Sequence, residues 1–135
     1  KLLNVSLIRT GAGKSFQKLG FHINRSKPKS ALFSTHTASH MSPLDSSDGY
    51  AVFSIRLDDF FPRDIPVALV KIDVEGFELD VLQGMQNILL TASPTLIVEN
   101  NDARVKKFLT DLGYVISNPG GKFSRNIVAQ RKHEA

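Results

Sequence analysis

The sequence predicts an α/β fold built on a mostly parallel sheet that an antiparallel strand closes. The prediction rests first on a nearly continuous apolar run at 67–74, which is typical of a parallel strand buried on both faces. It rests also on two amphipathic helical patterns, at 76–90 and 102–112, which flank a second apolar strand at 95–98. Strands that alternate with helices in this way are typical of parallel sheets.

The first part of the chain is predicted to hold three strands and one long loop. We expect strands at 4–8, 16–23 and 51–57, because β-branched and apolar residues dominate or alternate there. The stretch 26–48 is rich in Ser, Thr, Pro and Lys, and we expect it to form a surface loop or lid. One helical turn is expected at 57–61.

The last part of the chain is predicted to close the sheet with two strands. These strands span 114–117 and 126–129, on either side of an Asn-Pro-Gly-Gly turn at 118–121. Either residue of the pair at 101–102 can cap the helix that precedes them, and Gly113 can end that helix.

Composition indicates a globular chain that forms one domain or part of one. Of its 135 residues, 41 % are hydrophobic and 22 % are charged, which argues against a disordered protein. No apolar run approaches the roughly 20 residues that a membrane helix needs, and no signal-peptide pattern is present. The absence of Cys excludes disulfides and thiolate chemistry. We therefore expect a cytoplasmic protein that does not interact with a membrane.

The net charge of +4 leaves two interpretations of the basic residues, which lean toward the first third and the end of the chain. A nucleic-acid footprint is one interpretation. A solvated surface is the other, and we favour it because no aromatic-interleaved RNA-binding motif accompanies the charges. Nucleic acid is therefore not an expected partner.

The sequence Gly-Ala-Gly-Lys-Ser at 11–15 is similar to the end of a phosphate-binding loop. The full pattern needs a Gly where Ile8 stands, and the loop must open a helix so that backbone N–H groups meet the phosphates. Because 16–23 alternates as a strand does, we favour a simple turn after a strand.

His36 and His40 have the spacing of two metal ligands on one helix face. Their surroundings do not look helical, and no third ligand is obvious nearby. We expect two solvated loop histidines and no metal site.

Acidic residues follow the ends of both apolar strands. Asp73 and Glu75 alternate before Gly76, and period-two spacing puts both side chains on the same side of the backbone. Glu99 ends the next strand. Ligands of open α/β sheets bind beyond the carboxyl ends of the strands, so these acids suit contact with a cation or general-base work. Favourable charge at a helix N-terminus explains them equally well from spacing alone.

The stretch around the first acidic strand end closely resembles the FkbM-type methyltransferase family. The signature is Lys-Ile-Asp-Val-Glu-Gly at 71–76, followed by Glu78 and by Val-Leu-Gln-Gly at 81–84. Two further elements agree with the family, namely Leu-Asp-Asp at 57–59 and the strand Pro-Thr-Leu-Ile-Val-Glu at 94–99.

This resemblance implies a Rossmann-like class I sheet of seven strands, the last antiparallel. It implies methyl transfer from S-adenosylmethionine to a hydroxyl of a sugar, a lipid-linked glycan or a natural product. Gly11 and Ala12 would lie near the adenine, and Asp73 near both the sulfonium and the acceptor. Glu75 and Glu99 would line the acceptor pocket, which makes Asp73, Glu75 and Glu99 the predicted catalytic residues. Asp73 is either the base or an electrostatic or metal-linked anchor.

The family also has features that these 135 residues lack. Its first strand carries a Gly-rich cofactor loop, and its second ends in an acid that holds the ribose. We therefore expect residues 1–135 to be the C-terminal portion of a single methyltransferase domain, without the first two strands. The expected partner is a small-molecule or glycan acceptor, and a homo-oligomer is left open. The alternatives are a non-catalytic interaction module that retains the fold, or a basic nucleic-acid-binding domain.

Overall fold

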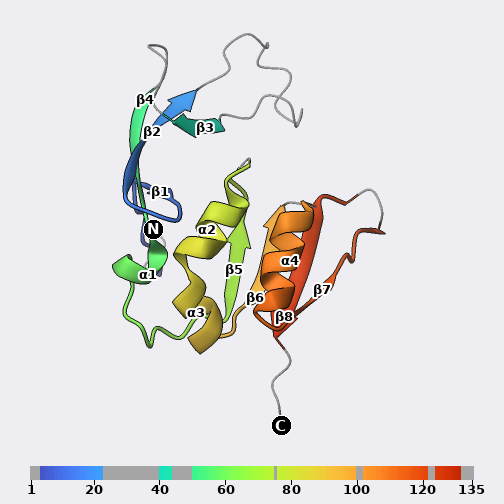
Figure 1. Ribbon diagram of the computed structural model, residues 1–135. Helices are drawn as coiled ribbons and strands as arrows, with labels where there is room; N and C mark the ends of the chain where they lie inside the picture. Colours follow the sequence, from blue (N-terminus) through green and yellow to red (C-terminus); the bar gives the residue numbers. More distant parts are fainter. Residues whose placement is uncertain are drawn as a thin grey trace.

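Two four-stranded sheets and four short helices make up the part of the chain that the structure describes (Figure 1). The structure is a computed structural model that describes residues 4–22, 40–43, 50–74, 76–99, 102–121 and 124–131. The first sheet holds β1 (Gly11–Ala12), β2 (Gln17–His22), β3 (His40–Pro43) and β4 (Tyr50–Ile55). The second sheet holds β5 (Leu69–Ile72), β6 (Thr95–Glu99), β7 (Tyr114–Ser117) and β8 (Asn126–Arg131). The helices are α1 (Leu57–Phe60), α2 (Glu78–Gly84), α3 (Gln86–Thr91) and α4 (Ala103–Asp111).

The first sheet has the order β1-β4-β2-β3, with β1 parallel to β4 and β2 antiparallel to both of its neighbours. Strands β2 and β4 confirm the strands predicted at 16–23 and 51–57. Strand β3 corrects the prediction that all of 26–48 is loop, because its four residues pair with β2. Its sequence, His-Met-Ser-Pro, has no apolar alternation, so backbone pairing rather than its own pattern makes it a strand. His40 therefore lies in a strand, and His36 lies outside the described residues.

The strand predicted at 4–8 is wrong. Its residues adopt no regular structure, and Val5, Leu7 and Ile8 are exposed. Strand-like composition alone is insufficient here, because within the described residues this segment pairs with no neighbouring strand. Strand pairing begins only at β1.

The second sheet has the order β5-β6-β8-β7, with β5 parallel to β6 and β8 antiparallel to β6 and β7. This arrangement confirms the predicted parallel pair and the antiparallel closing strands. Within the described residues β5 is an edge strand, and Leu69 is 56 % exposed. The prediction that the run at 67–74 is buried on both faces is therefore wrong, because the face of β5 that carries Leu69 is exposed.

One face of the second sheet carries the helices and the core. Figure 1 shows α2 and α4 side by side against this sheet, and the two helices contact each other. The core between helices and sheet includes the fully buried Leu82, Leu89, Leu96, Val98, Leu109 and Ile127. No helix in the described ranges is long and apolar enough to cross a membrane.

The single helix predicted at 76–90 is two helices, because the backbone leaves helical geometry at Met85 (φ −126°, ψ 24°). The other predicted helix, α4, begins and ends as expected. Asp102 caps it by accepting a hydrogen bond from the Arg104 N–H at 2.8 Å, and Gly113 follows it with φ 83°.

Helix α2 joins the two sheets through a close approach of two glycines. A Cβ on Gly84, the last residue of α2, would overlap the carbonyl oxygen of Gly13 beside β1. Next to this contact, Lys14 Nζ lies 3.1 Å from Asp80 Oδ1, and the Gly13 N–H donates to the Ile55 carbonyl at 3.0 Å. Only a residue without a side chain fits at Gly84.

Helix α3 depends on hydrogen bonds from residues far away in the sequence. The Asp58 carboxylate accepts from the N–H groups of Asn87 at 2.9 Å and Ile88 at 3.1 Å, and its side chain is 1 % exposed. At the other end, the Tyr114 hydroxyl donates to the Leu89 carbonyl at 3.1 Å. Arg131 Nη1 also donates to the Leu90 carbonyl at 2.9 Å. The Leu-Asp-Asp element therefore supplies the N-terminal cap that α3 lacks in its own sequence.

We expect Gly84→Ala to destabilise the protein by about 1 to 3 kcal/mol, because the methyl group forces α2 away from Gly13. Urea unfolding measures the change. The control is Gln83→Ala, on the exposed face of the same helix, which should leave the free energy of unfolding nearly unchanged. Unchanged or higher stability of Gly84→Ala would show that the close approach is not a constraint.

We expect Asp58→Ala to lower the free energy of unfolding by about 1 to 2 kcal/mol, because two helix N–H groups lose their acceptor. Asp58→Asn should lose less, because its amide oxygen still accepts. The adjacent Asp59, whose side chain is 69 % exposed, provides the control variant Asp59→Ala. Equal effects of Asp58→Ala and Asp59→Ala in urea unfolding would rule out the cap.

Candidate functional site

The acids that end β5 and β6 lie together on the second sheet. Parallel pairing aligns Ile72 with Val98, so the residues that follow them, Asp73 and Glu99, come next to each other. The carboxyl of Glu99 lies close enough to that of Asp73 to contribute to the lowered pKa of Asp73. The structure therefore brings together two of the three predicted catalytic residues, at the strand ends where ligands of parallel sheets bind.

Lys71 is the second partner of Asp73. Its Nζ lies 2.6 Å from Asp73 Oδ2, and the side chains of Lys71 and Asp73 are 54 % and 39 % exposed. The hydrogen bond from Lys71 is the main cause that lowers the pKa of Asp73; burial opposes it, and the nearby Glu99 adds to it. Asp73 is thus an ionised carboxylate that an incoming molecule can reach.

A glycine turn connects the site formed by Asp73 and Glu99, the carboxyl site, to α2. Gly76 has φ 104°, a left-handed conformation that favours glycine, and its N–H donates to Glu78 Oε1 at 3.0 Å. Glu78 is 2 % exposed, so its carboxylate fixes the turn from within the protein. The remaining predicted catalytic residue, Glu75, lies outside the described residues, and its role stays a prediction.

The residues predicted to lie near the adenine are in the other sheet. Gly11 and Ala12 form β1, which contacts α2, whereas Asp73 follows β5 and Glu99 ends β6 of the second sheet. Their part in cofactor binding stays a prediction. The phosphate-loop interpretation of 11–15 is excluded, because the segment leads into strand β2 rather than into a helix.

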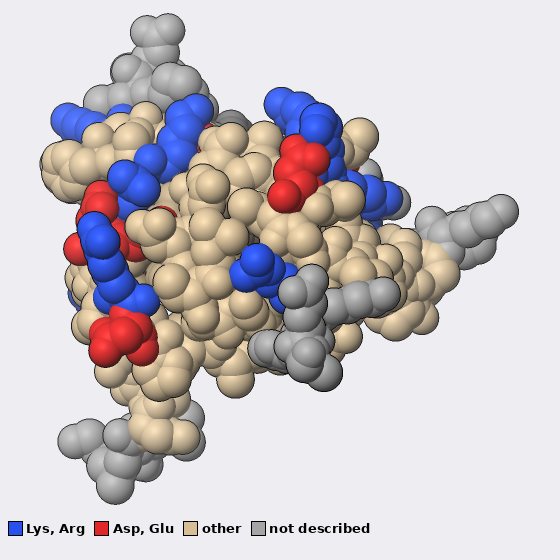
Figure 2. Space-filling model, turned by 60° about the horizontal axis from the view of Figure 1, so that its bottom comes forward, with Lys and Arg blue, Asp and Glu red and all other residues tan. Residues whose placement is uncertain are grey.

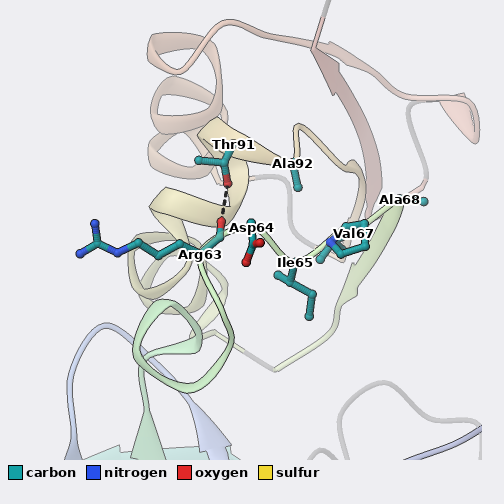
Figure 3. A pocket seen from close by; sticks show the side chains of 8 residues that line it. Arg63, Asp64, Ile65, Val67, Ala68, Thr91 and Ala92 are labelled. Carbon is teal, nitrogen blue, oxygen red and sulfur yellow. Dashed lines mark hydrogen bonds between the residues drawn. The ribbon is translucent and has the colours of Figure 1, made fainter.

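A hollow of about 640 Å³ lies at the opposite end of β5 from Asp73. Residues 63–68, Thr91 and Ala92 line it, and the Thr91 hydroxyl donates to the Arg63 carbonyl at 3.3 Å (Figure 3). The side chain of Arg63 points away from the hollow in this view, and much of the remaining lining is apolar. The hollow is therefore separate from the carboxyl site.

Basic and acidic groups are mixed on one face of the described part of the chain (Figure 2). Figure 2 shows one face on which they lie beside each other between broad uncharged areas. Lys107 pairs with Asp111 at 2.8 Å, and Arg104 pairs with Asp102 at 2.6 Å. A nucleic-acid footprint needs a basic field of one sign, which this face lacks. Among the described residues, no three His, Asp or Glu side chains lie close enough together to hold a metal ion.

The sequence analysis missed two residues with defined roles, Lys71 and Asp58. Lys71 and Asp73 occupy alternate positions of an extended chain, so period-two spacing was a sufficient signal for their pairing. Asp58 had no local signal, because its hydrogen-bond partners lie 29 and 30 residues further along the chain.

The comparisons with known proteins agree with the resemblance seen in the sequence. The family model described as the Methyltransferase FkbM domain matches residues 1–116, which is most of the 135-residue chain. No curated protein and no solved structure matches the chain. The extent of the family match, together with paired acids at the ends of two parallel strands, shows that the chain belongs to the FkbM methyltransferase domain family.

Proposed function

We propose that this chain forms the acceptor side of an S-adenosylmethionine-dependent methyltransferase site. The observation that carries the proposal is the Asp73–Glu99 carboxyl pair at adjacent parallel strand ends, in a chain of a methyltransferase family. The antiparallel strand β8 supports it, since the sheet expected for class I methyltransferases also ends in an antiparallel strand. The acceptor is a hydroxyl of a sugar, a glycan or a natural product.

The charge of the carboxyl pair suits the positive end of this methyl donor. Asp73 is ionised and 39 % exposed, so its carboxylate is placed to face a sulfonium and to receive a proton. S-adenosylmethionine supplies an activated methyl group when bound. Gly11 and Ala12 are the residues that we propose to lie near its adenine.

Asp73 acts on the acceptor in this proposal. A hydroxyl is weakly acidic, so its proton must leave as the oxygen attacks, and a base within hydrogen-bond reach increases the rate. Glu99 and, as the family resemblance implies, Glu75 would hold the other hydroxyls of the acceptor. A polyol acceptor fits a site whose walls are carboxylates, because carboxylates accept several hydrogen bonds.

We expect Asp73→Asn to lower methyl transfer by about 10²- to 10⁴-fold in the complete enzyme that contains residues 1–135, because the amide cannot accept the proton. Stability should change by less than about 1 kcal/mol, because solvent screens exposed ion pairs. Transfer of labelled methyl groups to sugar and glycan acceptors measures activity, and urea unfolding measures stability.

The matched control for Asp73→Asn is Asp111→Asn. Asp111 is also an exposed carboxylate paired with a lysine, at 2.8 Å from Lys107, but it lies at the end of α4. This variant should retain full activity. Near-normal turnover by Asp73→Asn would remove Asp73 from the catalytic residues, and the absence of methyl transfer to any hydroxyl acceptor would contradict the proposed function.

We expect residues 1–135 alone not to bind S-adenosylmethionine at micromolar concentration. The carboxyl pair contacts only the cationic end of that molecule, and the family's Gly-rich cofactor loop is not among these residues. Isothermal titration calorimetry of the 135-residue chain measures binding. Saturable micromolar binding would show that these residues also contain the adenosine site.

A further inference from the structure

We propose that Lys71 is a positioning residue of this site. Its ammonium group, in contact with the Asp73 carboxylate, holds Asp73 in the ionised form, so that Asp73 rather than Glu99 receives the proton of the acceptor hydroxyl. The inference rests on the proposed function and deepens it, because it assigns one base among the strand-end acids and names the residue that selects it.

The pairing of Ile72 with Val98 places the carboxyls of Asp73 and Glu99 next to each other. Because like charges at this distance repel, the pair loses its protons in two steps, and its surroundings decide which carboxyl ionises first. When different environments separate the pKa values of two neighbouring acids, one of them serves as the acid and the other as the base. The order in which the two carboxyls ionise therefore depends on a neighbouring charge that lies closer to one of them than to the other.

Lys71 is that asymmetric neighbour. It lies two residues before Asp73 on the same side of β5, with Nζ 2.6 Å from Oδ2. Among the described residues, the charged groups that affect the Asp73 carboxylate are Lys71 on β5 and Glu99 on β6, and Lys71 is the main cause of the lowered pKa of Asp73. Lys71 thus favours a negative charge on Asp73.

During methyl transfer, Asp73 takes one proton from the acceptor. The acceptor hydroxyl gives its proton to the Asp73 carboxylate, its oxygen forms the new bond to the methyl carbon, and the electron pair of the broken carbon–sulfur bond stays on sulfur. Lys71 takes no part in bond making. It compensates the charge of Asp73 before the reaction, and its ammonium group is exposed enough to move aside for the acceptor.

The proposal is tested by carbon NMR titration of the 135-residue chain labelled at Asp and Glu side-chain carboxyls. Asp73→Asn assigns the Asp73 signal. In the wild type, the Asp73 midpoint should lie below that of Glu99. In Lys71→Met the Asp73 midpoint should rise, and Lys71→Arg should hold it low, because the positive charge is kept. An unmoved midpoint in Lys71→Met, or a Glu99 that loses its proton first in the wild type, would overturn the proposal.

The matched control is Lys107→Met. It also removes an exposed lysine that pairs with a carboxylate, but on α4, so it should leave the Asp73 midpoint in place. Salt provides a second measurement, because about 1 M salt shortens the screening length to about 3 Å. High salt should raise the Asp73 midpoint in the wild type more than in Lys71→Met. Lys71→Gln replaces Lys71→Met if circular dichroism shows that the methionine variant is unfolded.

Activity separates this proposal from the proposed function. Lys71→Met should move the acidic limb of the kcat/KM profile to higher pH, because Asp73 then becomes protonated at a higher pH, and Lys71→Arg should restore the limb. The expected titration without any methyl transfer would overturn the proposed function and the base role of Asp73, while the order of ionisation would stand. Methyl transfer with an unmoved acidic limb in Lys71→Met would overturn the role of Lys71.

Discussion

Helix α3 is held at both ends by side chains that lie outside it, and those hydrogen bonds connect it to elements of both sheets. A helix of six residues does not form by itself, because its few internal bonds do not repay the cost of nucleation. Asp58, just after the first sheet, provides acceptors for its first turn. Tyr114 and Arg131, from the second sheet, donate to its last carbonyls. Within the described residues, the backbone of α3 is therefore one of two points at which the sheets are joined, the other being the contact of α2 with Gly13.

The contact between Gly84 and Gly13 has a second consequence, for the site. It fixes the end of α2 against the first sheet, and the chain then turns at Met85 into α3. The other end of α2 begins at Glu78, whose carboxylate holds the Gly76 turn after β5. Packing that is distant from the carboxyls of Asp73 and Glu99 thus orients the Gly76 turn that follows β5. The family signature therefore combines residues that hold α2 in place with residues of the site.

Local patterns predicted the elements whose residues carry their own signals. The alternation of the second half, the cap of α4 at Asp102 and the turn at Gly113 belong to this group. Local patterns did not predict the break between α2 and α3, because apolar residues continue at helical spacing through Leu82, Met85 and Leu89. Hydrogen bonds to Asp58 set the start of α3, and no window of local sequence contains both partners. Strand β3 was missed for the same reason, since its signal lies in its partner β2.

The register of β5 against β6 decides whether the carboxyl site exists. Pairing of Ile72 with Val98 turns both side chains toward the buried core, and it leaves Asp73 and Glu99 together on the opposite side. A one-residue slip of β6 would expose Val98, which is fully buried, and would turn Glu99 away from Asp73. Burial of apolar side chains therefore holds the acids in place, although it takes no part in their chemistry. The acids at the strand ends could be predicted from the sequence because they follow apolar residues. Their contact depends on the register between β5 and β6, which burial of Ile72 and Val98 fixes.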